Sequence, residues 1–208
     1  MIDSQTLLIF FSTAILLALS PGPDNLFVIA QSAQNGRAAG FAVTLGLCTG
    51  LVGHTLAVAF GLAAIVRASA IAFTILKAAG AIYLLYLAWK AWGAGAAAGQ
   101  TDAAQALSGQ ALYRRGIIMN LTNPKVSLFF LAFLPQFADP RHGSMALQFL
   151  QLGILFILGT LIVFGVLSLA AGGLGDRFRR SPSALKLVNR VASAVFVGLA
   201  VKLAFSER

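Results

Sequence analysis

The chain has 208 residues, of which 59% are apolar and 10% are charged. A soluble protein is about 45–50% apolar and about 25% charged, so a soluble globule of this length would expose much apolar surface to water. The composition therefore excludes a soluble enzyme, a nucleic-acid-binding protein and a secreted domain. Apolar windows of roughly 20 residues or more are long enough to span a bilayer. They predict an all-α membrane protein with six transmembrane helices: Thr6–Ala30, Gly40–Val66, Ser69–Trp92, Ile117–Ala138, Met145–Gly172 and Ala184–Phe205.

The net charge of +9, from 15 Lys and Arg against 6 Asp and Glu, indicates how the chain is oriented in the membrane. Short cytoplasmic loops carry an excess of Lys and Arg. With six spans both termini share one side, which holds four basic residues: Arg67, Arg141, Lys202 and Arg208. The opposite side holds nine: Arg37, Lys90, Arg114, Arg115, Arg177, Arg179, Arg180, Lys186 and Arg190. The sequence therefore predicts that both termini are periplasmic, and the basic charge requires no nucleic-acid partner.

The first window contains a polar, proline-rich segment, Ser20-Pro21-Gly22-Pro23-Asp24-Asn25. Pro21 and Pro23 each remove a backbone donor and obstruct the helix, and Gly22 adds backbone freedom. Non-helical backbone inside a bilayer must be buried in protein or line a wet cavity, and an acid such as Asp24 within a span is a functional candidate. The alternative is that the helix simply ends here and Asp24 caps the next helix at the membrane surface.

The second and third windows carry weaker candidates. His54 is a candidate proton relay, and the alternative is a packed structural histidine. Gly46, Gly50 and Gly53 form a small-residue face that favours close helix packing. In the third window, Lys77 is either a site residue or a lysine whose ammonium group snorkels to the interface.

Residues 93–116 are predicted to form a Gly- and Ala-rich cytoplasmic linker that ends in a basic pair. The linker divides the chain into a first three-helix repeat, residues 1–92, and a second one, residues 117–208. Short similarities at nearly one offset relate the halves: Leu17–Pro21 with Leu131–Pro135, and Lys77–Tyr83 with Arg190–Phe196. Three helices per half make the second repeat inverted across the membrane, an arrangement typical of transporters.

A second polar motif, Asn120-Leu121-Thr122-Asn123-Pro124-Lys125, lies near the start of the fourth window, and Pro124 predicts another helix break. The alternative is a polar helix entry from which Lys125 snorkels. Asp24 lies roughly 27 Å beyond Thr6, and Lys125 lies roughly 12 Å beyond Ile117 on an opposite-running span. Both are thus expected in the inner half of the membrane, where Asp24 and Lys125 would offset each other's burial. Broken helix ends there would suit an amino acid's ammonium and carboxylate groups.

The two motifs, together with further residues in the same order, resemble the LysE/RhtB family of bacterial amino-acid exporters. The further residues are Gly36-Arg37, Gly40, Lys77, Gly80, Tyr83, Leu84, Trp89-Lys90 and Phe133-Leu134-Pro135-Gln136-Phe137. The resemblance runs over nearly the whole chain. It implies a small six-helix protein of the bacterial inner membrane that exports amino acids, driven by the proton motive force. The RhtB branch is associated with homoserine, threonine and other neutral amino acids, and the LysE branch with lysine and arginine.

The residues favour the neutral branch. The exporters of basic amino acids carry extra acids in the second and fourth helices, whereas Leu45–Gly50 and Val126–Phe130 hold none. A cationic side chain would need a second buried counter-charge. We therefore expect export of neutral amino acids such as homoserine or threonine by proton antiport. Export of basic amino acids or of another small solute, and a passive channel, are the alternatives.

The expected site residues divide by role. Asp24 and Asn25 would bind the substrate ammonium group or the coupling proton, and Asn120, Asn123 and Lys125 would bind the carboxylate. Lys77 is a weaker candidate, and Pro21, Gly22, Pro23 and Pro124 would shape the breaks. No spacing of His, Cys and acidic residues suits a metal or a nucleophile and base, so neither a cofactor nor an enzymatic activity is expected. Six helices leave little bulk, which favours a homodimer without fixing the oligomeric state.

Overall fold

The computed structural model describes residues 2–20, 22–62, 70–93 and 107–179, with short pieces between 190 and 205. The described chain is nearly all helical and contains no strand. Its elements are α1 (Ser4–Leu19), α2 (Pro23–Asn35), α3 (Arg37–Leu56), η1 (Ala57–Leu62), α5 (Ala70–Gly93), α6 (Gly109–Leu121), α7 (Pro124–Leu128), η2 (Phe129–Phe133), η3 (Leu134–Phe137), η4 (Pro140–His142) and α8 (Met145–Arg179). The segments η1 and η2 are π-helical continuations of α3 and α7, and η3 and η4 are short 3₁₀ turns.

The described part of the chain has two to four candidate membrane spans. Arg37–Gly61 and Met145–Ala171 are each long and apolar enough to cross a bilayer. Two bent pairs also qualify: Ser4–Leu19 with Pro23–Asn35, and Gly109–Leu121 with Pro124–Phe137. Helix α5 covers the third predicted window but has a shorter apolar stretch, and half of the sixth window lies outside the described residues. The six-span inverted repeat therefore stays a prediction.

Local capping explains where several helices begin. The Asp3 carboxylate accepts hydrogen bonds from the backbone N–H and the hydroxyl of Thr6, which starts α1 at Ser4. Ser108 caps α6 by accepting from the N–H of Ala111. Because of this cap, residues 109–116 are helical and do not belong to the flexible linker that we predicted for residues 93–116. The preceding residues, 94–106, lie outside the described structure.

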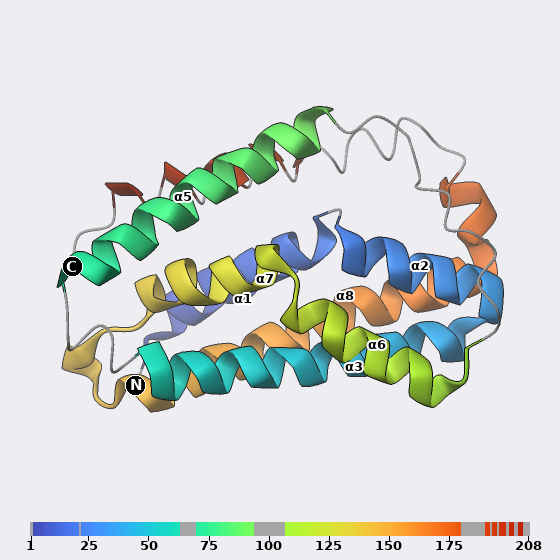
Figure 1. Ribbon diagram of the computed structural model, residues 1–208, viewed down its shortest axis with the longest axis horizontal. Coiled ribbons are helices and arrows are strands. Elements are labelled where there is room, and N and C mark those ends of the chain that lie inside the picture. Colours follow the sequence, from blue (N-terminus) through green and yellow to red (C-terminus); the bar gives the residue numbers. More distant parts are fainter. Residues whose placement is uncertain are drawn as a thin grey trace.

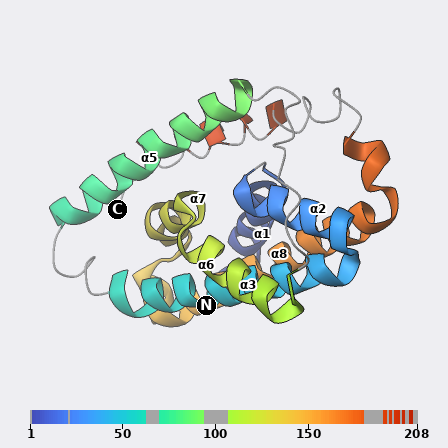
Figure 2. The same ribbon diagram turned by 45° about the vertical axis from the view of Figure 1, so that its right-hand side comes forward.

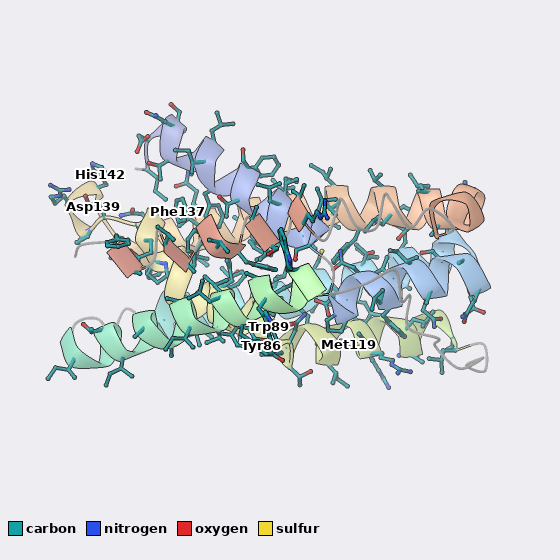
Figure 3. The ribbon with its side chains drawn as sticks, turned by 90° about the horizontal axis from the view of Figure 1, so that it is seen from above. Tyr86, Trp89, Met119, Phe137, Asp139 and His142 are labelled. Carbon is teal, nitrogen blue, oxygen red and sulfur yellow. The ribbon has the colours of Figure 1, made fainter. Side chains whose placement is uncertain are left out.

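The helices form a bundle with α5 along one side (Figures 1 and 2). Described pieces of the C-terminal region lie alongside α5, and the Ser193 hydroxyl donates a hydrogen bond to the Ala88 carbonyl at 2.8 Å. Viewed from above, Tyr86 and Trp89 lie together on α5, whereas Asp139 and His142 lie at one end of the molecule (Figure 3). Large apolar side chains point outward from most helices, including Leu8, Leu45, Ile82 and Ile154. Such a surface suits a lipid environment.

Two apolar clusters hold the bundle together. The larger one is aromatic: Phe10 of α1 meets Phe137 edge-on at 5.1 Å between ring centroids, and Phe129, Phe133 and Phe156 continue the cluster. It joins α1 to η2, η3 and α8. The smaller cluster contains Val28, Val43, Leu47, Leu112 and Phe164, and it joins α2, α3, α6 and α8. The candidate site lies where these helices meet.

Candidate functional site

Both predicted helix breaks exist, and they meet inside the bundle. The axes of α1 and α2 differ by 62°, and those of α6 and the segment Pro124–Phe137 differ by 48°. The Lys125 ammonium group joins the two breaks, because it donates to the carbonyls of Ser20 at 3.0 Å and Leu17 at 3.3 Å. In Figure 1 the turn from α6 to α7 lies in the middle of the molecule, as do the adjacent ends of α1 and α2.

These hydrogen bonds follow from the prolines in the sequence. In an unbroken helix the carbonyl of Leu17 would accept from the residue four positions later, which is Pro21 and has no N–H. Lys125 supplies the missing donor, and the side-chain amide of Asn25 donates to the neighbouring Ala18 carbonyl at 2.6 Å. A buried carbonyl without a partner costs free energy. Part of the role of Lys125 and Asn25 is therefore to stabilise the end of α1.

The position of Gly22 corrects one expectation. Its φ of −169° is ordinary extended backbone that any residue adopts, so Gly22 is not needed for backbone freedom. A Cβ added at this position would instead lie 3.1 Å from the Lys125 ammonium nitrogen. Glycine is thus suited to position 22 by the close approach of Lys125. Pro21 itself lies outside the described residues, whereas Pro23 and Pro124 begin α2 and α7, where a missing N–H is tolerated.

Asp24 does not cap a helix at the membrane surface, so that alternative is wrong. The N-cap of α2 is Gly22, no side chain caps this helix, and Asp24 is 3% exposed. Its carboxyl group lies near Asn120, Asn123 and Lys125, and the positive charge of Lys125 interacts with it electrostatically. The only direct ion pair in the described structure is Arg141 with Asp139, so Asp24 and Lys125 interact at longer range than we expected.

Asn120 and Asn123 are also buried, at 2% and 3% exposed. Asn123 is the N-cap of α7, because its side-chain oxygen accepts from the backbone N–H of Lys125 at 3.0 Å. Asn120 sits against Gly50 of α3, where an added Cβ would lie 2.7 Å from the amide oxygen. Gly46 and Gly53 likewise face α6, which confirms the predicted small-residue packing face. The close approach of α3 and α6 fixes the position of Asn120.

The breaks concentrate unpaired polar atoms. Of the buried side-chain atoms without a hydrogen-bond partner in the described structure, all but one belong to the two motifs: Ser20 Oγ, Asp24 Oδ1, Asn25 Oδ1, Asn120 Oδ1 and Asn123 Nδ2. The remaining one is Ser168 Oγ. Buried polar groups are normally paired. This arrangement leaves three amide or carboxyl oxygens, one hydroxyl and one amide NH2 group free to bind a polar ligand.

A small cavity lies against two of these residues, Asp24 and Asn120. Asp24, Asn120 and Lys125 contribute its polar side, and the other lining residues are Leu17, Ala18, Leu51, Val126, Phe156, Thr160 and Phe164. Its volume of about 20 Å³ has room for a water molecule. Thr160 was missed by the sequence analysis, because a single hydroxyl in an apolar window carries no signal until the helix faces are known.

His54, one of the weaker candidates, is not among the described residues that line this cavity. His54 lies beside the second break: its Nε2 is 3.2 Å from the Asn120 carbonyl oxygen, and its ring lies 5.5 Å from the ring of Phe130, tilted by 33°. It is half-buried, so it packs at the edge of the site, and its role as a relay is not tested by this geometry. Lys77 lies in α5, but its side chain is outside the described residues. The candidate role of Lys77 therefore stays a prediction.

Comparison with known proteins now identifies the chain. The family model described as LysE type translocator matches residues 15–207. The chain belongs to this family. A homoserine/homoserine lactone efflux protein of Salmonella typhi is 35% identical over 195 residues, which cover 94% of each chain. The protein of the same name from Salmonella typhimurium is 34% identical over 198 residues and 94% of each chain.

A third relative extends the similarity to the whole length. An uncharacterized membrane protein of Vibrio cholerae is 35% identical over 206 residues, or 99% of each chain. No solved structure is significantly similar. The sequence-based identification of the LysE/RhtB family is thus confirmed, and the chain is a membrane translocator rather than an enzyme.

Proposed function

We propose that this translocator exports neutral amino acids, such as homoserine or threonine, from the bacterial cytoplasm across the inner membrane by proton antiport. It would work as two inverted three-helix repeats with both termini in the periplasm. The printed names of the Salmonella relatives, homoserine/homoserine lactone efflux protein, support the substrate class. The chain's own support comes from the chemistry of the two broken helices.

The set of unpaired buried atoms carries the proposal. An ammonium group presents three N–H donors, and the free oxygens of Asp24, Asn25 and Asn120 are three acceptors. A carboxylate requires donors, and the free amide N–H of Asn123, the Ser20 hydroxyl and the remaining N–H of Lys125 supply them. Both halves of an amino-acid backbone would therefore find partners at the junction of the breaks.

The cavity lining supports a neutral side chain. Asp24 is the only acid among the lining residues, and Lys125 adds a positive charge beside it. A second cation on the substrate would be buried without a counter-charge of its own, which is costly. The wall formed by Leu51, Phe156 and Phe164 would instead contact an uncharged side chain.

Asp24 is the proposed coupling residue. Its carboxyl group would bind the substrate ammonium when ionised and would carry a proton on the return path, so that one site serves two cations in turn. Lys125 does not form an ion pair with it, which leaves the carboxylate available to both. Release of the substrate to the periplasm would then be linked to proton uptake at the same group.

Transport by everted membrane vesicles tests the proposal, because export in the cell corresponds to uptake in these vesicles. With the lumen acidified, labelled homoserine and threonine should accumulate, and collapse of the pH gradient should abolish the accumulation. Asp24→Asn, which keeps the shape and removes the titratable carboxyl, should lower uptake by tenfold or more. Asp139→Asn makes the same change in an exposed loop and should transport like the wild type.

Each alternative has its own outcome in this assay. Uptake that needs no gradient, or full activity of Asp24→Asn, would refute proton antiport through Asp24. Accumulation of lysine or arginine but not of homoserine would refute the neutral substrate class. Equilibration without accumulation would indicate a passive channel.

A further inference from the structure

One wall of the cavity comes from α8, and it contains a single polar residue. Phe156, Thr160 and Phe164 all line the cavity. They recur every four positions, so they lie on one face of the helix. Each is at most 4% exposed. This wall belongs to neither broken helix pair. If the breaks hold the ammonium and carboxylate groups of an amino acid, its side chain can contact the wall formed by α8.

The hydroxyl of Thr160 differs from those of other helical threonines in the described structure. Thr44, Thr55 and Thr122 each donate to the carbonyl four residues earlier, at 2.7 to 2.9 Å. That bond satisfies a buried hydroxyl without any further partner. Thr160 is 3% exposed and makes no such bond, yet it lines the cavity. Its hydroxyl is therefore available at the cavity to exchange a hydrogen bond with a ligand.

We propose that the Thr160 hydroxyl recognises a hydroxyl group on the side chain of the transported amino acid. This inference rests on the proposed function and makes its substrate class narrower: neutral amino acids that carry a side-chain hydroxyl, preferred over apolar amino acids of the same shape. The breaks hold the ammonium and carboxylate groups, Phe156 and Phe164 contact the carbon atoms of the side chain, and Thr160 exchanges a hydrogen bond with its oxygen. A substrate without that oxygen would fill the cavity and leave the Thr160 hydroxyl without a hydrogen-bond partner in the bound state.

Pairs of matched substrates and variants test this assignment. Threonine and valine have the same shape and differ by a hydroxyl, as do homoserine and norvaline. In everted vesicles the wild type should transport the hydroxylated member of each pair with a kcat/KM roughly three- to tenfold higher, the range for one neutral hydrogen bond. Thr160→Val, which replaces the hydroxyl by a methyl group, should bring both ratios close to one. Thr160→Ser should keep them.

Thr44→Val is the matched control. Thr44 is fully buried on α3, its hydroxyl donates to the Gly40 carbonyl, and it does not line the cavity. This variant should leave both substrate ratios at the wild-type values even if it lowers the amount of folded protein. A ratio is insensitive to expression level, so it separates recognition of the hydroxyl from a general loss of folded transporter.

Several results would overturn the inference. A wild type that takes up valine as well as threonine would do so, as would Thr160→Val with an unchanged ratio or Thr160→Ser with a lost one. If Thr160→Val is not recovered, Thr160→Ala removes the same hydroxyl without adding volume, and the same criteria apply. These failures leave amino-acid transport itself intact. A wild type that transports no amino acid refutes the proposed function, and this inference with it.

Discussion

Replacing Lys125 by methionine tests how the two breaks hold each other. Methionine has a similar length and no donor. The change leaves the carbonyls of Leu17 and Ser20 without their partner, at about 1–3 kcal/mol for each buried acceptor. It also leaves Asp24 without the nearby positive charge. Removing one member of a buried charged set costs about 3–5 kcal/mol, and we expect Lys125→Met to lose a similar amount of stability.

Thermal unfolding of the purified protein in detergent measures this loss. For a chain of this size, 1 kcal/mol corresponds to about 2–4 °C in Tm, so Tm should fall by about 6–20 °C. The double variant Asp24→Asn with Lys125→Met should recover part of the difference, since it removes the buried charge that the single variant leaves behind.

Arg141→Met is the control for loss of a cation, because the Arg141 side chain is 86% exposed in a loop. Because solvent screens the exposed pair of Arg141 with Asp139, its Tm should fall far less than that of Lys125→Met. A Tm of Lys125→Met within about 2 °C of the wild-type Tm would correspond to a loss of about 1 kcal/mol or less. That result would refute the claim that Lys125 stabilises the end of α1.

Two further predictions concern packing and pH. Gly46→Ala should lower the free energy of unfolding by roughly 1–3 kcal/mol, because the added Cβ would meet the Tyr113 carbonyl. Gly61→Ala is the control and should change stability little, because no atom lies within 4 Å of the added Cβ. Equal Tm values for the two variants would contradict the close packing of α3 and α6. In the loop before α8, a hydrogen bond from the Arg141 side chain lowers the pKa of Asp139 to about 2. The folded state therefore gains from this pair above about pH 3.9, the ordinary value for Asp, and loses the gain as pH falls toward 2. An NMR titration should show the pKa of Asp139 rising in Arg141→Met, and an unshifted value would contradict the pairing.

The sequence by itself determined the class of protein and the place of the breaks. An apolar excess without a soluble domain requires a bilayer, and the prolines at 21, 23 and 124 prevent a continuous helix because each lacks a backbone N–H. Polar residues beside those prolines had to be buried in protein, because lipid offers no partners. These constraints depend on composition or on residues close together in the sequence, so the sequence alone reveals them. The same residues carry the family resemblance.

The tertiary structure decided which groups are paired and which are free. The sequence predicted Asp24 and Lys125 as partners, but the Lys125 ammonium group binds the carbonyls of α1, and Gly22 serves to admit it. Residues more than 100 positions apart meet there, and no local pattern specifies which donor reaches which acceptor. Thr160 could be recognised as a candidate site residue only from the position of α8 beside the breaks. Hydrogen bonding is a matter of three-dimensional proximity, so the unpaired atoms that define the candidate site follow from packing and not from the order of residues.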